Sequence, residues 1–86
     1  MAKRIALVGI IVEDSAAAER INSVLHDYGE NIIGRMGLPY RQRGVHVISV
    51  VMDAENDVIS SMAGKIGKIP GVSVKTVYQK ETPNVC

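Results

Sequence analysis

Two short segments of this chain are apolar at almost every position, and they limit most strongly how it can fold. They are Ile5–Val12 and Val45–Met52, and both are rich in β-branched residues. Segments of this length are short for a helix and far shorter than the roughly 20 residues that span a bilayer, so each predicts a buried strand. Because side chains alternate between the two faces of a strand, both faces of these strands are apolar. We therefore expect both strands at the centre of a sheet.

The first of these strands is followed by a helical pattern. Apolar residues recur at spacings of three and four over 15–28, which predicts an amphipathic helix. Asp14 and Ser15 can each cap its start, and Gly29 supplies a stop signal.

A second helix is predicted after the second central strand. Asp53 is its expected cap, and Gly67 is expected near its end, before the turn at Pro70 and Gly71. Gly64 and Gly67 are costly inside a helix, so we expect close approach of the helix to the sheet or helix termination at these positions.

Two further strands are predicted at the edges of the sheet. Segment 31–39 contains two glycines and a closing proline, and segment 72–78 alternates between apolar and polar residues. The order β-α-β-β-α-β, with right-handed crossovers, predicts an α+β, ferredoxin-like fold. Its four-stranded antiparallel sheet should carry both helices on one face. We expect one domain over 1–80 and a flexible C-terminal tail over 81–86.

The two helices can cover only one face of such a sheet. The other apolar face would meet water in a monomer, and an exposed aliphatic surface of that size marks an interface. We therefore expect a homodimer or higher oligomer that forms through sheet faces or sheet edges. In the first central strand one face should carry Ile5, Leu7 and Ile11, and the other Ala6, Val8, Ile10 and Val12. In the second central strand Val45, Val47 and Val51 should lie opposite Ile48, Val50 and Met52.

Composition argues against several functions. The 86 residues carry a net charge of +1, which gives no strong attraction to nucleic acid or to an anionic membrane. The single cysteine, Cys86, cannot form an intrachain disulfide or a self-contained cysteine metal site. The central strands contain none of the aromatic residues that an RNA-recognition module stacks against bases. We expect no nucleic-acid or membrane partner and a cytoplasmic location.

Residues for catalysis or metal binding are sparse. No serine has an evident histidine and carboxylate arrangement around it, so we expect no enzyme activity and no cofactor. His26 and His46 are the candidate metal ligands, but they lack a local ligand spacing. We expect no metal site within one chain, although a site that joins His46 of several subunits stays open.

Four segments carry a resemblance to a known family. They are Val12-Glu13-Asp14, Leu25–Glu30, Arg35–Arg41 and Ser61–Thr76. With them, the chain resembles the iron-only hydrogenase system regulators, small proteins with an ACT-like fold. The resemblance implies a stand-alone regulatory domain that senses a small effector at a subunit interface, with a possible protein partner in a hydrogenase system.

The resemblance also directs attention to particular residues. The effector candidates are Glu13, Asp14, Ser15, Arg35 and Arg41, with the two arginines facing an anion. ACT-like domains often carry a glycine in the first strand-to-helix turn, and this turn has none, which departs from the usual amino-acid pocket.

Two alternatives stay open. One is a ligand-free scaffold that docks a protein through the hairpin and the basic residues of the last quarter. The other is an oligomeric metal sensor that resembles the nickel-responsive repressors and uses His26 or His46.

Overall fold

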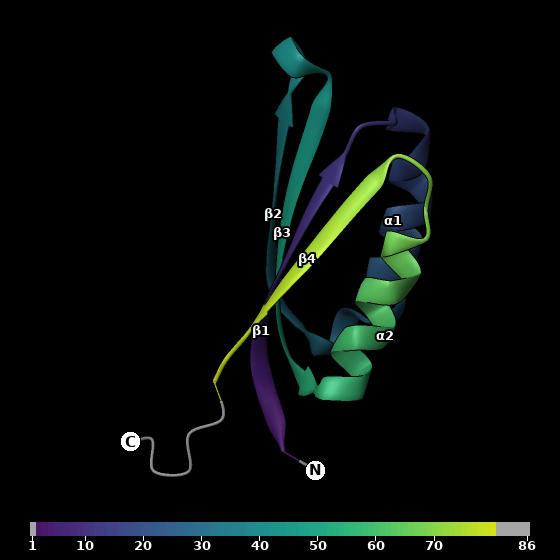
Figure 1. Ribbon diagram of the computed structural model, residues 1–86. Coiled ribbons are helices and arrows are strands. Elements are labelled where there is room, and N and C mark those ends of the chain that lie inside the picture. Colours follow the sequence, from purple (N-terminus) through teal and green to yellow (C-terminus); the bar gives the residue numbers. More distant parts are fainter. Residues whose placement is uncertain (1, 81–86) are drawn as a thin grey trace.

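The computed structural model describes residues 2–80, and the predicted 81–86 tail lies outside them (Figure 1). The strands are β1 (Lys3–Val12), β2 (Ile32–Tyr40), β3 (Val45–Glu55) and β4 (Val72–Tyr78). The α-helices are α1 (Ala18–Asp27) and α2 (Asn56–Gly67), and the short 3-10 turns are η1 (Ser15–Ala17), η2 (Gly29–Asn31) and η3 (Arg41–Arg43).

The four strands form one sheet in the order β2-β3-β1-β4, and every neighbouring pair is antiparallel. Both helices lie on the same face of this sheet (Figure 1). The α+β, ferredoxin-like prediction is therefore confirmed, with the two doubly apolar strands in the middle.

The core lies between the sheet and the helices and is wholly aliphatic. No polar or charged residue is buried among the described residues. The buried positions alternate along β1 and β3, as the two-residue period of a strand requires. The largest fully buried side chains of the core are Val8, Ile10, Ile21, Leu25, Val50, Met52, Ile59, Met62 and Ile66.

The prediction that Asp53 caps the second helix is wrong. Asp53 lies within β3 and pairs with Ile5 of β1, and the helix begins after Glu55, which makes no side-chain capping bond. The physical reason is that β1 begins at Lys3, so its first residues give the end of β3 a partner for continued pairing. The first helix also starts differently, since Ser15–Ala17 form a 3-10 turn before α1.

The register of the β2–β3 hairpin sets which side chains of β2 face which way, and a bulge near the start of β2 interrupts it. The pairing with β3 shifts between Ile32 and Gly34. Beyond this shift, Arg35 pairs with the buried Val50 and therefore faces the helices. Met36 and its alternate neighbours along β2 face the uncovered side.

The β2–β3 hairpin extends past the start of α1, so its tip stands clear of the helical layer (Figure 1). Between residues 2 and 80, no helix has both the length and the apolar character that a membrane crossing requires.

Candidate functional site

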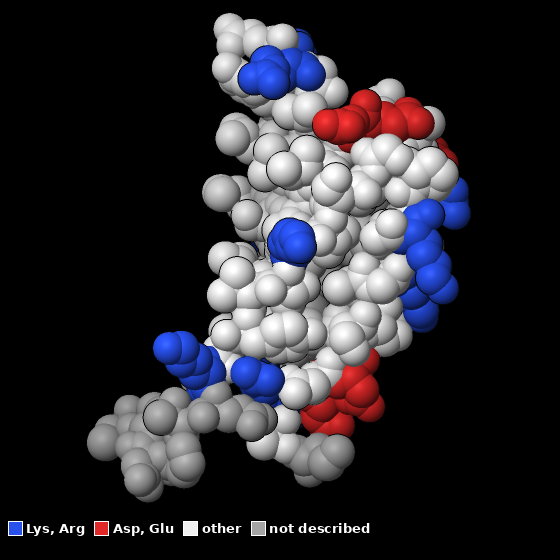
Figure 2. All heavy atoms as spheres, viewed as in Figure 1, with Lys and Arg blue, Asp and Glu red and all other residues white. Residues whose placement is uncertain are grey.

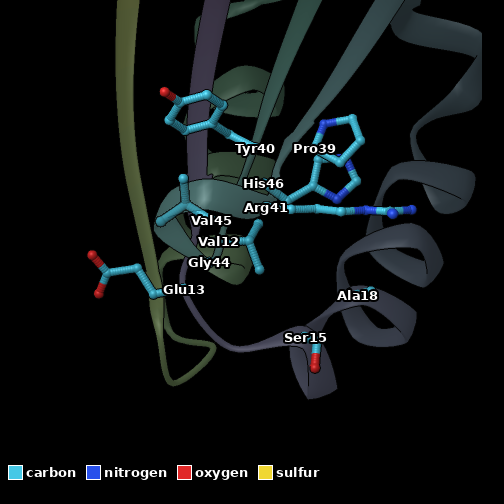
Figure 3. Close-up of a pocket in the computed structure, with 10 residues that line it drawn as sticks. All are labelled: Val12, Glu13, Ser15, Ala18, Pro39, Tyr40, Arg41, Gly44, Val45 and His46. Carbon is cyan, nitrogen blue, oxygen red and sulfur yellow. The ribbon is translucent and has the colours of Figure 1, made fainter.

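A pocket of about 450 Å³ lies between the tip of the β2–β3 hairpin and the turn that joins β1 to α1 (Figure 3). Two segments that are distant in sequence build it: residues 12–18, from the end of β1 to the start of α1, and residues 39–46 of the hairpin. The lining residues are Val12, Glu13, Ser15, Ala18, Pro39, Tyr40, Arg41, Gly44, Val45 and His46.

Hydrogen bonds and a close contact fix the β1–α1 turn. The Asp14 carboxylate accepts a hydrogen bond from the Ala16 N–H at 3.0 Å. The Glu13 N–H donates to the Gly71 carbonyl at 2.8 Å, which ties the turn to the loop before β4. Gly71 has a φ of 79°, and a Cβ atom added there would lie 2.7 Å from the Asp14 Cβ. Asp14 therefore shapes the turn, while Glu13 and Ser15 line the pocket beside it.

The hairpin positions the other wall of the pocket. Arg41 begins the η3 turn, which closes on Gly44 in the left-handed conformation with a φ of 66°. His46 lies directly across from Pro39 and pairs with Val12, so its imidazole is on the helix side of the sheet. A Cβ atom added at Gly37 would lie only 3.1 Å from the His46 Nε2. The missing side chain at Gly37 therefore makes room for this ring.

The polar side chains of the pocket are free to meet a ligand. Within residues 2–80, the side chains of Glu13, Ser15, Arg41 and His46 make no hydrogen bond or ion pair. Arg41 and His46 both line the pocket, the Ser15 hydroxyl is directed away from them, and the Glu13 carboxylate points to the other side, toward β4 (Figure 3). A guanidinium and an imidazole that line one pocket are suited to an anionic group, because both can donate hydrogen bonds to it.

The structure brings together three of the five effector candidates. Glu13, Ser15 and Arg41 line the pocket, and Asp14 lies at its border in the capping role. Arg35 does not join them. It lies in the middle of β2, and its guanidinium donates to the Asn22 Oδ1 of α1 at 3.2 Å.

His46 enters the pocket, although the sequence suggested it only as a metal candidate. The signal that could have placed it there is the hairpin register, which pairs it with Pro39. His26 lies in the last turn of α1, at the other end of that helix from the pocket. Among residues 2–80, no three His, Cys, Asp or Glu side chains come close enough to share a metal ion.

The basic residues of the last quarter do not gather on one surface. Lys65 lies on α2, with its ammonium 5.1 Å from the centre of the Tyr28 ring. Lys75 lies on β4 and lines a hollow on the opposite face of the sheet. A docking protein would therefore meet them from different sides.

The family of the chain follows from comparison with known sequences. Residues 4–76 match the sequence model of the family described as "TM1266-like: Iron-only hydrogenase system regulator, putative". The chain belongs to this family. No curated protein matches the chain.

Solved structures agree with this family and with the fold. The family protein TM1266 from Thermotoga maritima, itself uncharacterised, is 38% identical, with a TM-score of 0.87 over 91% of this chain and 99% of that one. The ACT domain of a GTP pyrophosphokinase from Chlorobium tepidum is 20% identical, with a TM-score of 0.74 over 88% of this chain and 100% of that domain. The C-terminal domain of the MgtC protein from Mycobacterium tuberculosis is 10% identical, with a TM-score of 0.71 over 91% of this chain and 89% of that one. The last two similarities show the fold alone, which is ACT-like.

Proposed function

We propose that this chain is an ACT-like regulatory domain that responds to a small effector with an anionic group, bound in the pocket at the β2–β3 hairpin, called here the hairpin pocket. One observation carries the proposal: Arg41 and His46 line one pocket with apolar walls, and neither side chain has a partner among the described residues. The family description supports an iron-only hydrogenase system as the regulated system, and the proposed location is the cytoplasm.

The chemistry of the pocket defines the kind of effector. A carboxylate or phosphate group would sit beside Arg41 and His46, both of which can donate hydrogen bonds to it. The aliphatic part of the molecule would lie against Val12 and Pro39. The Glu13 carboxylate, on the other side, would favour an effector that also carries a positive group and would disfavour one that is only anionic.

The position of the pocket supports a link between effector binding and self-association. Tyr40 and Val45 line the pocket and are paired at the end of the hairpin. Their register also puts them on the uncovered face of the sheet. A subunit that contacts this face would therefore meet the rim of the pocket.

The test is an NMR titration of isotopically labelled protein with a panel of small carboxylates, aliphatic amino acids and inorganic phosphate. We expect amide shifts confined to the β1–α1 turn and the β2–β3 hairpin. Arg41→Gln should weaken the binding about tenfold or more, because it removes a charge-assisted hydrogen bond.

Arg35→Gln is the matched control, since it makes the same change on the same hairpin but outside the pocket. It should leave binding as in the wild type. Equal effects of the two variants, or shifts from the panel that avoid the pocket, would contradict the proposal.

The same spectra test the metal-sensor alternative. Addition of nickel, iron or zinc to metal-free protein should leave the resonances of His26 and His46 in place if the effector is organic. Selective loss or movement of these resonances would favour the metal sensor instead.

A further inference from the structure

The face of the sheet away from the helices is a continuous apolar surface. Six large aliphatic side chains on it are between 39% and 66% exposed: Ile5, Leu7, Ile11, Met36, Leu38 and Val77. Figure 2 shows this side at the left, almost free of charged side chains between the hairpin tip and the lower end. Monomeric proteins rarely expose a contiguous apolar patch larger than a few hundred Å².

A hollow of about 240 Å³ lies in the middle of this face. It is centred on Gly9 of β1 and bordered by Ile11, Val47, Ser73 and Lys75. The hollow is larger than the ~150 Å³ cavity that admits a benzene molecule, so it can receive a branched aliphatic side chain.

Nothing within the subunit explains a glycine at this position. Gly9 does not have a positive φ, and the pairing with β3 and β4 runs through it without a bulge. A Cβ atom added there would meet its nearest neighbour, the Lys75 carbonyl oxygen, at an ordinary distance of 3.8 Å. A glycine in the interior of a strand, with no bulge or bend, often marks a place where another molecule approaches closely.

We propose that a second copy of this chain packs face to face on this surface, with an aliphatic side chain of each subunit in the Gly9 hollow of the other. The interface does not require a bound effector, although it reaches Tyr40 at the rim of the pocket.

Charge on this face suits a second copy of the same chain. The pairing register puts Lys3, Glu55, Asp53 and Lys75 on it, two of each sign. The first three lie at one end of the face. Lys75 lies on the outer strand directly across from Gly9, where its long side chain can carry the ammonium to the polar rim that protein interfaces have. A surface with balanced charge is complementary to itself, which a two-fold interface requires. A strongly acidic or basic partner would find no such match.

The area is also sufficient. Four strands of seven to eleven residues, at a spacing of about 4.8 Å, cover roughly 600 Å² in projection. The relief of the side chains adds to this value. Stable interfaces bury about 800 Å² on each partner, so the face is close to the size that one subunit contributes.

The test is sedimentation equilibrium of the full chain, with thermal unfolding of each variant as the check on folding. We expect a wild-type dimer at tens of micromolar. Gly9→Val fills the hollow with a residue that favours strands, and it should fold while weakening the dimer at least tenfold. Leu7→Glu, on the surface of the same face, is the second variant and should give a folded monomer. Gly64→Ala is the control, because Gly64 is an exposed position of α2 on the other side of the sheet, and this variant should dimerise as the wild type does.

Three results would overturn the proposal. The first is a wild-type protein that is still monomeric at 100 µM, which would mean that a different protein covers the face. The second is a dimer that both Gly9→Val and Leu7→Glu leave intact, which would indicate association through the sheet edges. The third is a control variant, Gly64→Ala, whose dimer is weakened as much as that of Gly9→Val.

Discussion

Gly71→Ala should destabilise the fold through the turn that borders the pocket. Gly71 has a φ of 79°, and the left-handed conformation costs a residue with a Cβ roughly 1–2 kcal/mol. The new Cβ would also lie 2.7 Å from the Asp14 Cβ, so the turn must shift. That shift strains the 2.8 Å hydrogen bond between Glu13 and the Gly71 carbonyl. We expect a total loss of about 2–3 kcal/mol.

For a domain of this size, 1 kcal/mol moves the melting temperature by about 4–8 °C, so Tm should fall by roughly 10–20 °C. Circular dichroism during heating and denaturant titration measures the loss. All variants are compared at one protein concentration, because self-association stabilises the fold by mass action.

Gly64→Ala is the matched control. Gly64 was expected to allow close approach of the helix to the sheet, but no atom lies within 4 Å of a Cβ added there. The substitution should therefore stabilise α2 by about 1 kcal/mol. A Gly71→Ala variant as stable as the wild type would refute the reasoning, since it would mean that the turn moves freely.

Two other predictions concern contacts at the surface. Arg4→Ala should lower the free energy of unfolding by about 1 kcal/mol in denaturant titration, because the guanidinium donates to the Gln79 carbonyl and lies 5.1 Å from the centre of the Tyr78 ring. An unchanged midpoint would contradict this. The hydrogen bond with Ser61 lowers the pKa of Tyr28 below its ordinary value of 10.0. Ionised Tyr28 therefore stabilises the fold above the unfolded-state pKa, and this contribution is lost as pH falls through the lowered pKa. Ser61→Ala should move the first step of the tyrosinate absorbance titration to higher pH, and an unmoved step would count against the contact.

The sheet and its core could be predicted because the central strands carry a strong two-sided apolar pattern. Val8 and Val50 are buried under the helices, while Leu7 lies on the uncovered face, as alternation requires. The end of β3 could not be placed, because Asp53 is a good helix cap by residue type. Pairing with β1, which is a property of the whole sheet, overrides that preference.

The pocket was predictable only in part. Glu13 and Ser15 follow a strand directly, so their placement at its end needs little beyond local sequence. Arg41 and His46 meet only because the hairpin has one particular register. A slip of one residue would put His46 on the opposite face. The turn over residues 41–44 sets this register, so a turn one residue longer or shorter would change it.

Arg35 also shows that residue type alone does not predict which side chains reach the pocket. By residue type it is as good an anion ligand as Arg41, and it lies on the same hairpin. Its position in the middle of β2 puts it against Asn22 of α1 instead. Gly9 drew no attention in the sequence, because a glycine within an apolar strand is conspicuous only once its neighbours on the face are known.

Native mass spectrometry of the wild type and Arg41→Gln tests the central claim most directly. Both proteins would first be equilibrated with a small-molecule extract of cells that contain an iron-only hydrogenase. The account predicts a retained small mass on the wild type, in proportion to its subunits, that Arg41→Gln loses. The same retained mass on both proteins, or none on the wild type, would contradict an effector site in the hairpin pocket.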